Sequence, residues 1–308
     1  MNKNLHEARR IKNDEFYTQI GDIEREVRHY RSPFKNKTVF CNCDDPRISN
    51  FFRYFTLNFE LLELKKLITT CYRSDKLDLF SQNDKDEAVY MEYDGSKKDG
   101  GKLPDVDGVG ITYLKGNGDF RSRECIDLLE QSDIVCTNPP FSLFKEYIKQ
   151  LITYNKKFLI IGNYNAVIYQ DIFPLIKENK MWLGVEPWGM TFNTPDGKET
   201  YSRMTKWFTN LPHTKRNEEI TLTKKYKNNE SDYPKYDSYD AIEVSKVLDI
   251  PKDYAGVMGV PITFLVDYNP AQFDIVGSMA TTTIDQYNFG CPTINNKKVY
   301  ARILIRRK

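Results

Sequence analysis

The residues best suited to chemistry stand at the end of a short apolar segment. Asp133-Ile-Val-Cys136 is typical of a buried strand, and Asn138-Pro-Pro-Phe141 follows soon after it. The two prolines fix φ and remove two backbone donors, so the chain leaves the strand rigidly with carbonyl oxygens presented outward. An amide, a carbonyl and an aromatic face can together hold a planar amino-heterocycle, because the oxygens accept both N–H groups while the ring stacks on Phe141.

This arrangement suits the activation of an exocyclic amine. The amino nitrogen of adenine is a poor nucleophile because its lone pair is delocalised into the ring. Two acceptors, Asn138 Oδ1 and the Pro139 carbonyl, favour pyramidalisation of that nitrogen and stabilise its developing positive charge, without a covalent intermediate. Pro140 and Phe141 complete the candidate catalytic set. The alternative is a rigid strand-to-helix turn with no catalytic role.

The elements that must position this motif alternate between strands and helices. Expected strands are 37–41, 66–71, 133–136 and 157–161, and a hairpin is expected near 88–94. Expected helices are 22–30, which Pro33 should end, 49–55, 125–130, 144–154 and 166–177. The alternation predicts an α/β fold, with a mostly parallel sheet and helices on both faces. In such sheets ligands bind beyond the carboxyl ends of the strands.

Composition bounds the rest of the chain. Its 308 residues, 40% hydrophobic and 29% charged, exclude a wholly disordered protein. No apolar run reaches about 18 residues, so no membrane partner is expected, and an N-terminus without an apolar signal region predicts a cytoplasmic protein. The six cysteines are expected to be free thiols, and Cys41-x-Cys43 lacks zinc-site spacing, so no metal site is predicted.

Three regions are expected along the chain. Residues 1–180 read as a catalytic core, and 181–250 as an insert in which aromatic residues, Thr, Asn and Lys increase. Residues 251–308 carry apolar runs at 260–266, 273–276 and 300–305, which predict a return to the core sheet before a basic C-terminus. Net charge is only +2, but 203–227 holds seven Lys or Arg against two Asp or Glu, and 297–308 holds six against none. These stretches indicate an anionic partner or merely a solvated surface.

The tetrapeptide resembles the catalytic element of S-adenosylmethionine-dependent methyltransferases that act on adenine N6 in DNA. Segments along nearly the whole chain resemble the EcoRI-type adenine-specific DNA methyltransferase family: Asn2-Lys-Asn-Leu-His-Glu-Ala8, Asp14-Glu-Phe-Tyr-Thr-Gln19, Val39-Phe-Cys-Asn-Cys-Asp-Asp-Pro-Arg-Ile-Ser-Asn-Phe-Phe52, Asn138-Pro-Pro-Phe-Ser-Leu-Phe144, Gly259-Val-Pro-Ile-Thr-Phe264 and Ala301-Arg-Ile-Leu-Ile-Arg-Arg307. The resemblance implies a Rossmann-like methyltransferase fold, S-adenosylmethionine as cofactor, and 181–250 as a target-recognition insert.

The resemblance also implies a donor site built from several segments. Phe16 or Tyr17 would pack on the donor and Thr18 would bond its carboxylate, the alternative being core aromatics. The loop from Cys41 through Asn42 to Asp44 and Asp45 lacks the usual glycine. Either carboxylate there could bind the donor's ammonium or ribose, or Asp45 before Pro46 could cap a helix.

A third segment resembles the element that recognises the donor's adenine. Asp119 would accept from the adenine amino group and Phe120 would pack on its ring, the alternative being a surface turn. Asn138 is also expected near the donor. The second strand, ending at Thr70-Cys71, offers no clear acid for the ribose, and that contact stays unassigned.

The implied partner is double-stranded DNA. A target amine inside the base stack requires base flipping, with Phe141 stacking on the flipped adenine. The basic stretches 203–227 and 297–308 are candidates for phosphate contacts. A restriction–modification, phage or orphan modification setting fits, with a cognate restriction endonuclease acting separately and no obligate protein partner evident.

Two other classes of function remain open at this point. The same tetrapeptide chemistry fits a methyltransferase acting on cytosine N4, RNA adenine or a glutamine amide. A catalytically silent DNA-binding or regulatory subunit would also keep the fold; the glycine-free loop 41–46 favours it and the intact tetrapeptide opposes it.

Overall fold

The chain forms two compact units, which are described separately. The computed structural model describes residues 17–72, 88–96, 110–186, 189–193, 199–280 and 286–308. The first unit comprises Met1–Tyr164 with Glu186–Leu211, and the second Asn165–Val185 with Pro212–Lys308. The predicted insert 181–250 is thus shared between the two units, and its role in recognition stays a prediction.

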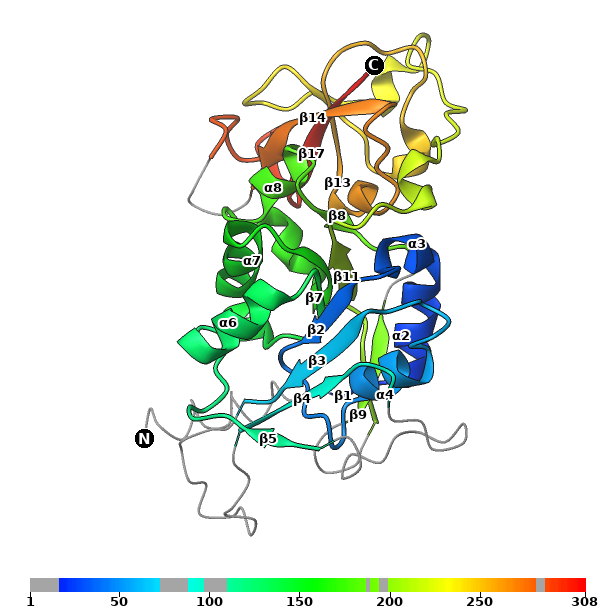
Figure 1. Ribbon diagram of the computed structural model, residues 1–308. Helices are drawn as coiled ribbons and strands as arrows, with labels where there is room; N and C mark the ends of the chain where they lie inside the picture. Colours follow the sequence, from blue (N-terminus) through cyan, green and yellow to red (C-terminus); the bar gives the residue numbers. More distant parts are fainter. Residues whose placement is uncertain (1–16, 73–87, 97–109, 187–188, 194–198, 281–285) are drawn as a thin grey trace, which may run out of the picture. The chain divides into compact units, whose positions relative to one another are not determined.

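A large sheet forms the centre of the first unit (Figure 1), with strand order β5-β4-β3-β2-β6-β7-β11. Its middle strands β3 (Lys66–Thr70), β2 (Thr38–Cys41), β6 (Ile134–Thr137) and β7 (Lys157–Asn163) are parallel to one another. Strands β4 (Val89–Tyr93), β5 (Thr112–Tyr113) and β11 (Thr205–Thr209) pair antiparallel beside them. The predicted mostly parallel α/β fold is confirmed.

Helices cover both faces of this sheet. Helices α2 (Ile20–Val27) and α4 (Asn50–Leu57) lie on one face, and α6 (Arg123–Gln131) and α7 (Phe144–Thr153) on the other (Figure 1). Every residue of β2 and β6 is buried, as expected for strands covered on both faces. Ser49 and Ser122 begin α4 and α6 because each hydroxyl accepts from the backbone of the first turn.

A small ribbon also belongs to the first unit. Strand β9 (Met190–Asn193) pairs antiparallel with β1 (Tyr17–Thr18) on one side and β10 (Glu199–Ser202) on the other. Because α2 begins at Ile20, directly after β1, the ribbon and this helix are connected by Gln19 alone.

The second unit is built on a separate four-stranded sheet, with order β12-β13-β17-β14. Its strands are β12 (Ile242–Glu243), β13 (Met258–Pro261), β14 (Phe273–Met279) and β17 (Arg302–Arg307). Helix α8 (Phe173–Lys177), strand β8 (Trp182–Leu183) and a hairpin of β15 (Thr293–Ile294) with β16 (Lys297–Lys298) complete it. Short 3₁₀ helices are η4 (Thr214–Asn217), η5 (Glu230–Asp232), η6 (Val247–Asp249) and η7 (Ile262–Val266).

Strands β12, β13, β14 and β17 correct one expectation. Residues 251–308 were predicted to return to the core sheet, yet β13, β14 and β17 pair with one another in the second unit's own sheet. An apolar run identifies a strand but not its partner, so periodicity could not decide between the two sheets.

Local boundaries differ from expectation at three places. Pro33 does not end the first helical segment, because α3 (Arg31–Phe34) accommodates it in a first turn, where a missing N–H costs little. The helix expected over 166–177 is divided into η3 (Tyr164–Ile168) and α8. The strand expected over 260–266 stops at Pro261 and becomes η7.

No helix among the residues that the structure describes is long and apolar enough to span a bilayer.

Candidate active site

The candidate site lies where β2 and β6 end side by side. These strands are parallel neighbours, with Phe40 opposite Val135, so the loops after them leave from the same edge of the sheet. From β2 the chain passes through α4 to β3 on one side, while β6 lies on the other side. This reversal of strand order is the position where open α/β sheets bind ligands.

Asp44 joins the two loops. Its carboxylate accepts from Thr137 Oγ1 at 2.5 Å and from Ser49 Oγ at 2.9 Å, and its backbone N donates to the Thr70 carbonyl at 3.0 Å. Burial raises the pKa of Asp44 to about 6 against the opposing effect of the two hydroxyl donors. Thr137 immediately precedes Asn138, so the loop after β2 is fixed directly to the start of the tetrapeptide 138–141.

The glycine-free loop closes by side-chain contacts. Asn42 is buried, and its Oδ1 accepts from the Tyr147 hydroxyl of α7. None of residues 41–46 has a positive φ, so this loop does not need glycine. Cys41 is fully buried, and desolvation raises the pKa of the Cys41 and Cys43 thiols above their ordinary range, which keeps both protonated.

The tetrapeptide forms the turn between β6 and α7. Asn138 Oδ1 is a buried atom, Pro139 is buried, and Pro140 and Phe141 are half-buried. The Pro140 carbonyl accepts from Leu143 N at 3.0 Å as η2 (Phe141–Leu143) begins. The Pro139 carbonyl is therefore the one that remains as a candidate acceptor beside Asn138.

Gly118 and Phe120 pack against the same group of elements. Gly118 has φ +72°, and a Cβ there would collide with the carbonyl of Cys71, just beyond β3. Phe120 is buried edge-on against Tyr147, with ring centroids 5.1 Å apart, and its carbonyl accepts from Gln150 Nε2 at 2.9 Å. Helix α7 therefore ties the 118–120 element and the loop after β2 to the tetrapeptide.

Two predicted acidic residues are held by neighbouring arginines. Asp119 accepts from Arg121 through Nε at 2.9 Å and Nη2 at 2.7 Å, which holds the pKa of its carboxyl below the usual range. Asp45 accepts from Arg47 at 2.8 Å and 2.6 Å. The expectation that Asp45 caps the following helix is wrong, because the cap is Ser49; Asp45 instead accepts from the backbone of Arg47 two residues on.

The N-terminal element is described only in part. Phe16 lies outside the described residues, and of Tyr17 only the backbone, in β1, is described. Thr18 is buried, and its Oγ1 has no hydrogen-bond partner among the residues the structure describes. Its carbonyl accepts from Asn50 Nδ2 at 2.8 Å, which places it beside the Ser49 cap and hence beside Asp44.

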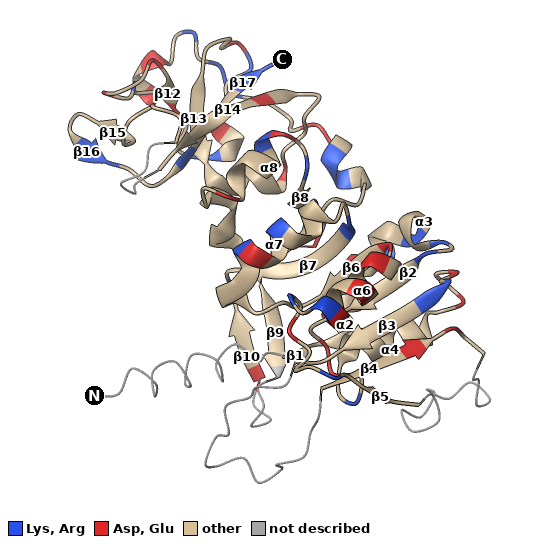
Figure 2. Ribbon diagram, turned by 60° about the vertical axis from the view of Figure 1, so that its left-hand side comes forward, with Lys and Arg blue, Asp and Glu red and all other residues tan. Residues whose placement is uncertain are grey.

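The basic stretches divide into structural and exposed residues. Lys206 is fully buried and donates to the Glu186 carbonyl, and Arg302 is 11% exposed and pairs with Glu243 at 2.6 Å. Neither is therefore available as the surface phosphate contact that its stretch suggested. The lysines of β16 are exposed within the second unit (Figure 2). Several aromatics of 181–250 are core residues, namely Trp207, Tyr233 and Tyr236, and Trp188 lies outside the described residues.

Sequence reasoning missed Thr137, Ser49, Tyr147 and Asn50. Thr137 could have been noticed, because a hydroxyl directly before Asn138 ends a buried strand. Tyr147 lies three residues after Phe144 on the apolar stripe of α7, so its spacing indicates a core residue and conceals its hydroxyl contact.

Known proteins resemble this chain over nearly its whole length. The family model for the adenine-specific methyltransferase EcoRI matches residues 4–308. The chain is 49% identical to the type II methyltransferase M.EcoRI of Escherichia coli, covering 100% of this chain and 97% of the relative. It is 41% identical to M.MgeORF184P of Mycoplasma genitalium, covering 99% and 98%, and 36% identical to M.MpnI of Mycoplasma pneumoniae, also covering 99% and 98%. No solved structure matches. The chain therefore belongs to the EcoRI family of adenine-specific DNA methyltransferases.

Proposed function

We propose that this chain transfers a methyl group from S-adenosylmethionine to N6 of an adenine flipped out of duplex DNA, with Asn138 and the Pro139 carbonyl as the activating acceptors. One observation carries the proposal: Asp44, in the loop after β2, bonds Thr137 directly before Asn138. A donor-binding loop and an amine-activating motif are thereby held as one unit at the ligand-binding edge of the sheet.

The tetrapeptide supplies electrostatic activation. Asn138 Oδ1 and the Pro139 carbonyl accept the two N–H groups of the target amine, and they stabilise its positive charge as the nitrogen becomes tetrahedral. Because both prolines fix the backbone and Thr137 is held by Asp44, these acceptors need little reorganisation during the reaction. No side chain of the set forms a covalent bond to the substrate.

The residues around the β2 loop fit the methyl donor. Thr18 offers a buried hydroxyl that has no partner among the described residues, which suits the donor's carboxylate. The Asp44 carboxylate suits its ammonium group, and the close approach of Gly118 to the Cys71 carbonyl leaves the 118–120 backbone near the edge of β3. When bound, the donor supplies an electrophilic methyl group on a sulfonium.

Phe141 and the exposed basic residues are proposed to act on DNA. Phe141 is half-buried and stands next to the acceptors, so its ring can stack on the flipped base. Lys297 and Lys298 are exposed and can contact phosphate. We expect the protein to act in the cytoplasm, in a restriction–modification, phage or orphan setting, and any cognate endonuclease to be a separate chain.

Product identification tests this function. The protein would be incubated with S-adenosylmethionine carrying a labelled methyl group and with duplex DNA, and the DNA would then be digested to nucleosides. Label in N6-methyladenine is the expected result. Label in N4-methylcytosine or in protein would contradict the proposed substrate, and no transfer by folded protein would indicate a catalytically silent subunit.

A further inference from the structure

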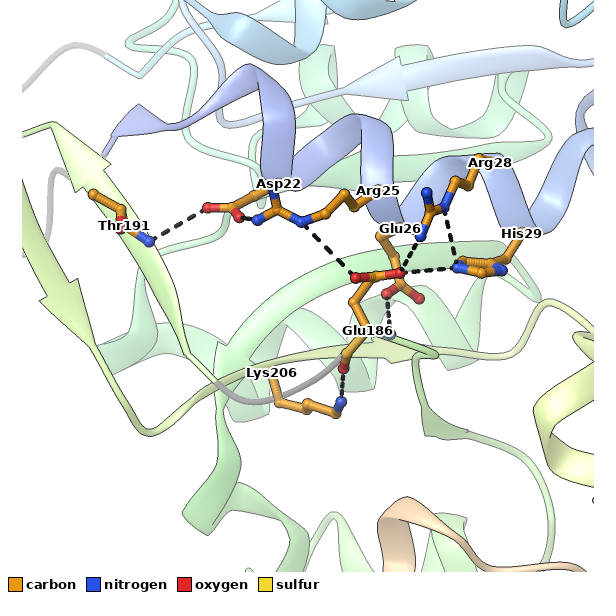
Figure 3. Close-up of polar contacts among 8 residues, drawn as sticks. All are labelled: Asp22, Arg25, Glu26, Arg28, His29, Glu186, Thr191 and Lys206. Carbon is orange, nitrogen blue, oxygen red and sulfur yellow. Dashed lines mark hydrogen bonds and ion pairs between the residues drawn. The ribbon is translucent and has the colours of Figure 1, made fainter.

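In the first unit, a group of buried acidic and basic side chains outside the candidate site binds the backbone of Glu186. Glu26 of α2 is fully buried; its Oε1 accepts from the Tyr30 hydroxyl at 2.6 Å and its Oε2 from the Glu186 backbone N at 2.8 Å. Lys206 of β11 is also fully buried, and its Nζ donates to the Glu186 carbonyl. Both backbone groups of Glu186 are thus bound by buried acidic and basic side chains (Figure 3).

The Glu186 side chain is held as well. Its carboxylate accepts from Arg28 Nη2 at 3.0 Å and from His29 Nε2 at 3.0 Å, and Arg25 Nε lies 3.8 Å away. Burial opposes ionisation of this carboxyl, but the hydrogen bonds from His29 and Arg28 prevail and lower its pKa. Glu186 therefore stays charged at neutral pH and is bound by Arg28 and His29, which directly follow α2.

A second contact from α2 reaches β9. Asp22, in the first turn of the helix, is 7% exposed and accepts from Thr191 N at 3.3 Å, while Arg25 pairs with the same carboxylate (Figure 3). Helix α2 and the turn that follows it, η1 (Arg28–Tyr30), thus contact both Glu186 and Thr191. We call this set of contacts the α2 clamp: Asp22, Glu26, Arg28, His29, Glu186 and Lys206.

The clamp leads to Thr18 through the ribbon. Strand β9 pairs with β1, with Phe192 opposite Thr18, and β1 continues into α2 through Gln19. Thr18 is therefore fixed along the chain by α2 and across the ribbon by β9, and the clamp joins these two supports. Burying an acidic and a basic side chain is costly, and apolar residues of similar volume often stabilise a fold as well or better, so stability alone does not account for Glu26 and Lys206.

We propose that Glu26 and Lys206 are positioning residues for the methyl donor: they fix the backbone of Glu186 beside α2, while Asp22 of the same helix binds Thr191 of β9, and together these contacts keep the Thr18 hydroxyl oriented into the donor site. This inference rests on the proposed function, in which Thr18 bonds the donor's carboxylate. The clamp itself touches neither donor nor DNA, so its loss affects binding of S-adenosylmethionine more than the transfer step.

The first test replaces Lys206. Lys206→Met keeps the length and apolar stem of the side chain but removes the donor to the Glu186 carbonyl. We expect the dissociation constant for S-adenosylmethionine, measured by calorimetry, to rise about tenfold, as a small displacement far from the chemistry can cause. The turnover number at saturating donor should change by less than about threefold, because uniform binding is lost and transition-state contacts are kept.

A double-mutant cycle asks whether the clamp acts through Thr18. Thr18→Val should weaken donor binding by itself, and Lys206→Met should then add little in the Thr18→Val background. Unchanged donor affinity in Lys206→Met, or a full additional loss in the Thr18→Val background, would overturn the clamp. Unchanged donor affinity in Thr18→Val would in addition refute the role of Thr18, while the nucleoside assay tests the methylation reaction separately.

A matched control separates positioning from general stability. Glu243 in the second unit is also a buried carboxylate that accepts from a tyrosine, Tyr236, and pairs with an arginine. Glu243→Gln should lower the free energy of unfolding and leave donor affinity unchanged. If Glu243→Gln weakens donor binding as much as Lys206→Met does, the clamp has no specific role. If Lys206→Met does not fold, Glu26→Gln replaces it in these tests, because glutamine keeps the shape of the side chain and one acceptor oxygen. The same results are then expected for donor affinity and turnover.

Discussion

At the scale of single residues, the proposed function gives separate roles to Asp44 and Asn138. Asn138 is recognisable as a candidate from its place in the tetrapeptide, because two prolines fix the backbone that follows it at the end of a buried strand. Asp44 is recognisable only as one of two adjacent carboxylates. The structure distinguishes them: Asp44 bonds Thr137 and Ser49, and Asp45 bonds Arg47.

The raised pKa of Asp44 predicts a pH effect on activity. As the pH falls below this pKa of about 6, protonation takes an acceptor away from Thr137 or Ser49, so the methylation rate should decrease through this range. The Asp44→Asn variant should have a lower methylation rate, and its rate should not decrease further as the pH falls through this range. The measurement is the turnover number at saturating substrates across pH. Glu63→Gln, which removes an exposed partner of Lys35, is the control and should keep the decrease at low pH.

The same group has an opposite effect on stability. Its pKa is raised from 3.8 to about 6 on folding, so its stabilising contribution is complete below the unfolded value and is lost as pH rises through the folded value. The free energy of unfolding of Asp44→Asn relative to the native chain should therefore increase with pH over this interval. Denaturant titrations on both sides of it would detect the change, and a constant difference would contradict the burial of Asp44.

The Thr137 hydroxyl gives a test of the link itself. Thr137→Val keeps the shape but leaves the buried Asp44 carboxylate with one donor fewer, at a cost of about 1–3 kcal/mol in unfolding free energy. We expect the turnover number to fall while donor affinity changes little. Thr153→Val is the matched control, because its hydroxyl bonds only its own helix at the Lys149 carbonyl. Equal turnover in both variants would mean that the link is not used in catalysis.

At the scale of elements, the turn from β6 into α7 unites the site. The strand, the tetrapeptide and the helix were predictable, because a buried apolar run, two prolines and a 3.6-residue period each have a distinct signature. Which elements α7 would touch was not predictable, since Tyr147 and Gln150 reach loops far away in sequence. The sheet joined by 251–308 was mispredicted for the same reason: pairing is a long-range property.

Phe141, at the start of η2, is the residue proposed to stack on the flipped base. Phe141→Ala should weaken binding of the adenine that is flipped out of the duplex, because stacking on an aromatic ring contributes about 1–3 kcal/mol per base. Fluorescence of 2-aminopurine at the target position would report flipping, and the loss should be partly restored by a mismatch opposite the target, which lowers the cost of flipping. Unchanged fluorescence and turnover on duplex DNA would refute the role.

At the scale of the whole molecule, net charge and composition identified a globular protein but not its DNA-facing residues. Some residues of the basic stretches are buried and bonded within the fold, such as Lys206 and Arg302. Others are exposed, such as Lys297 and Lys298. Charge in a sequence cannot distinguish these classes, because burial depends on partners such as Glu243.

Replacing the exposed lysines of β16 should change the salt dependence of DNA binding. Lys297→Gln with Lys298→Gln should reduce the slope of log affinity against log salt by about 0.9 for each phosphate that is no longer neutralised. Affinity should fall similarly for specific and unrelated duplexes. Lys180→Gln, which removes an exposed lysine that pairs with Glu178, serves as the control. An unaltered slope would exclude β16 from the DNA interface.

The role proposed for Asn138 is to activate the target amine without being the main support of the donor. Asn138→Ala removes the amide acceptor and leaves Asp44, Thr18 and Thr137 intact. Single-turnover methylation of duplex DNA, with donor binding measured on the same preparation, tests this directly. We predict that the transfer rate falls about a hundredfold or more while donor affinity is nearly unchanged. An equal loss of transfer and donor binding, or transfer at the native rate, would contradict this role.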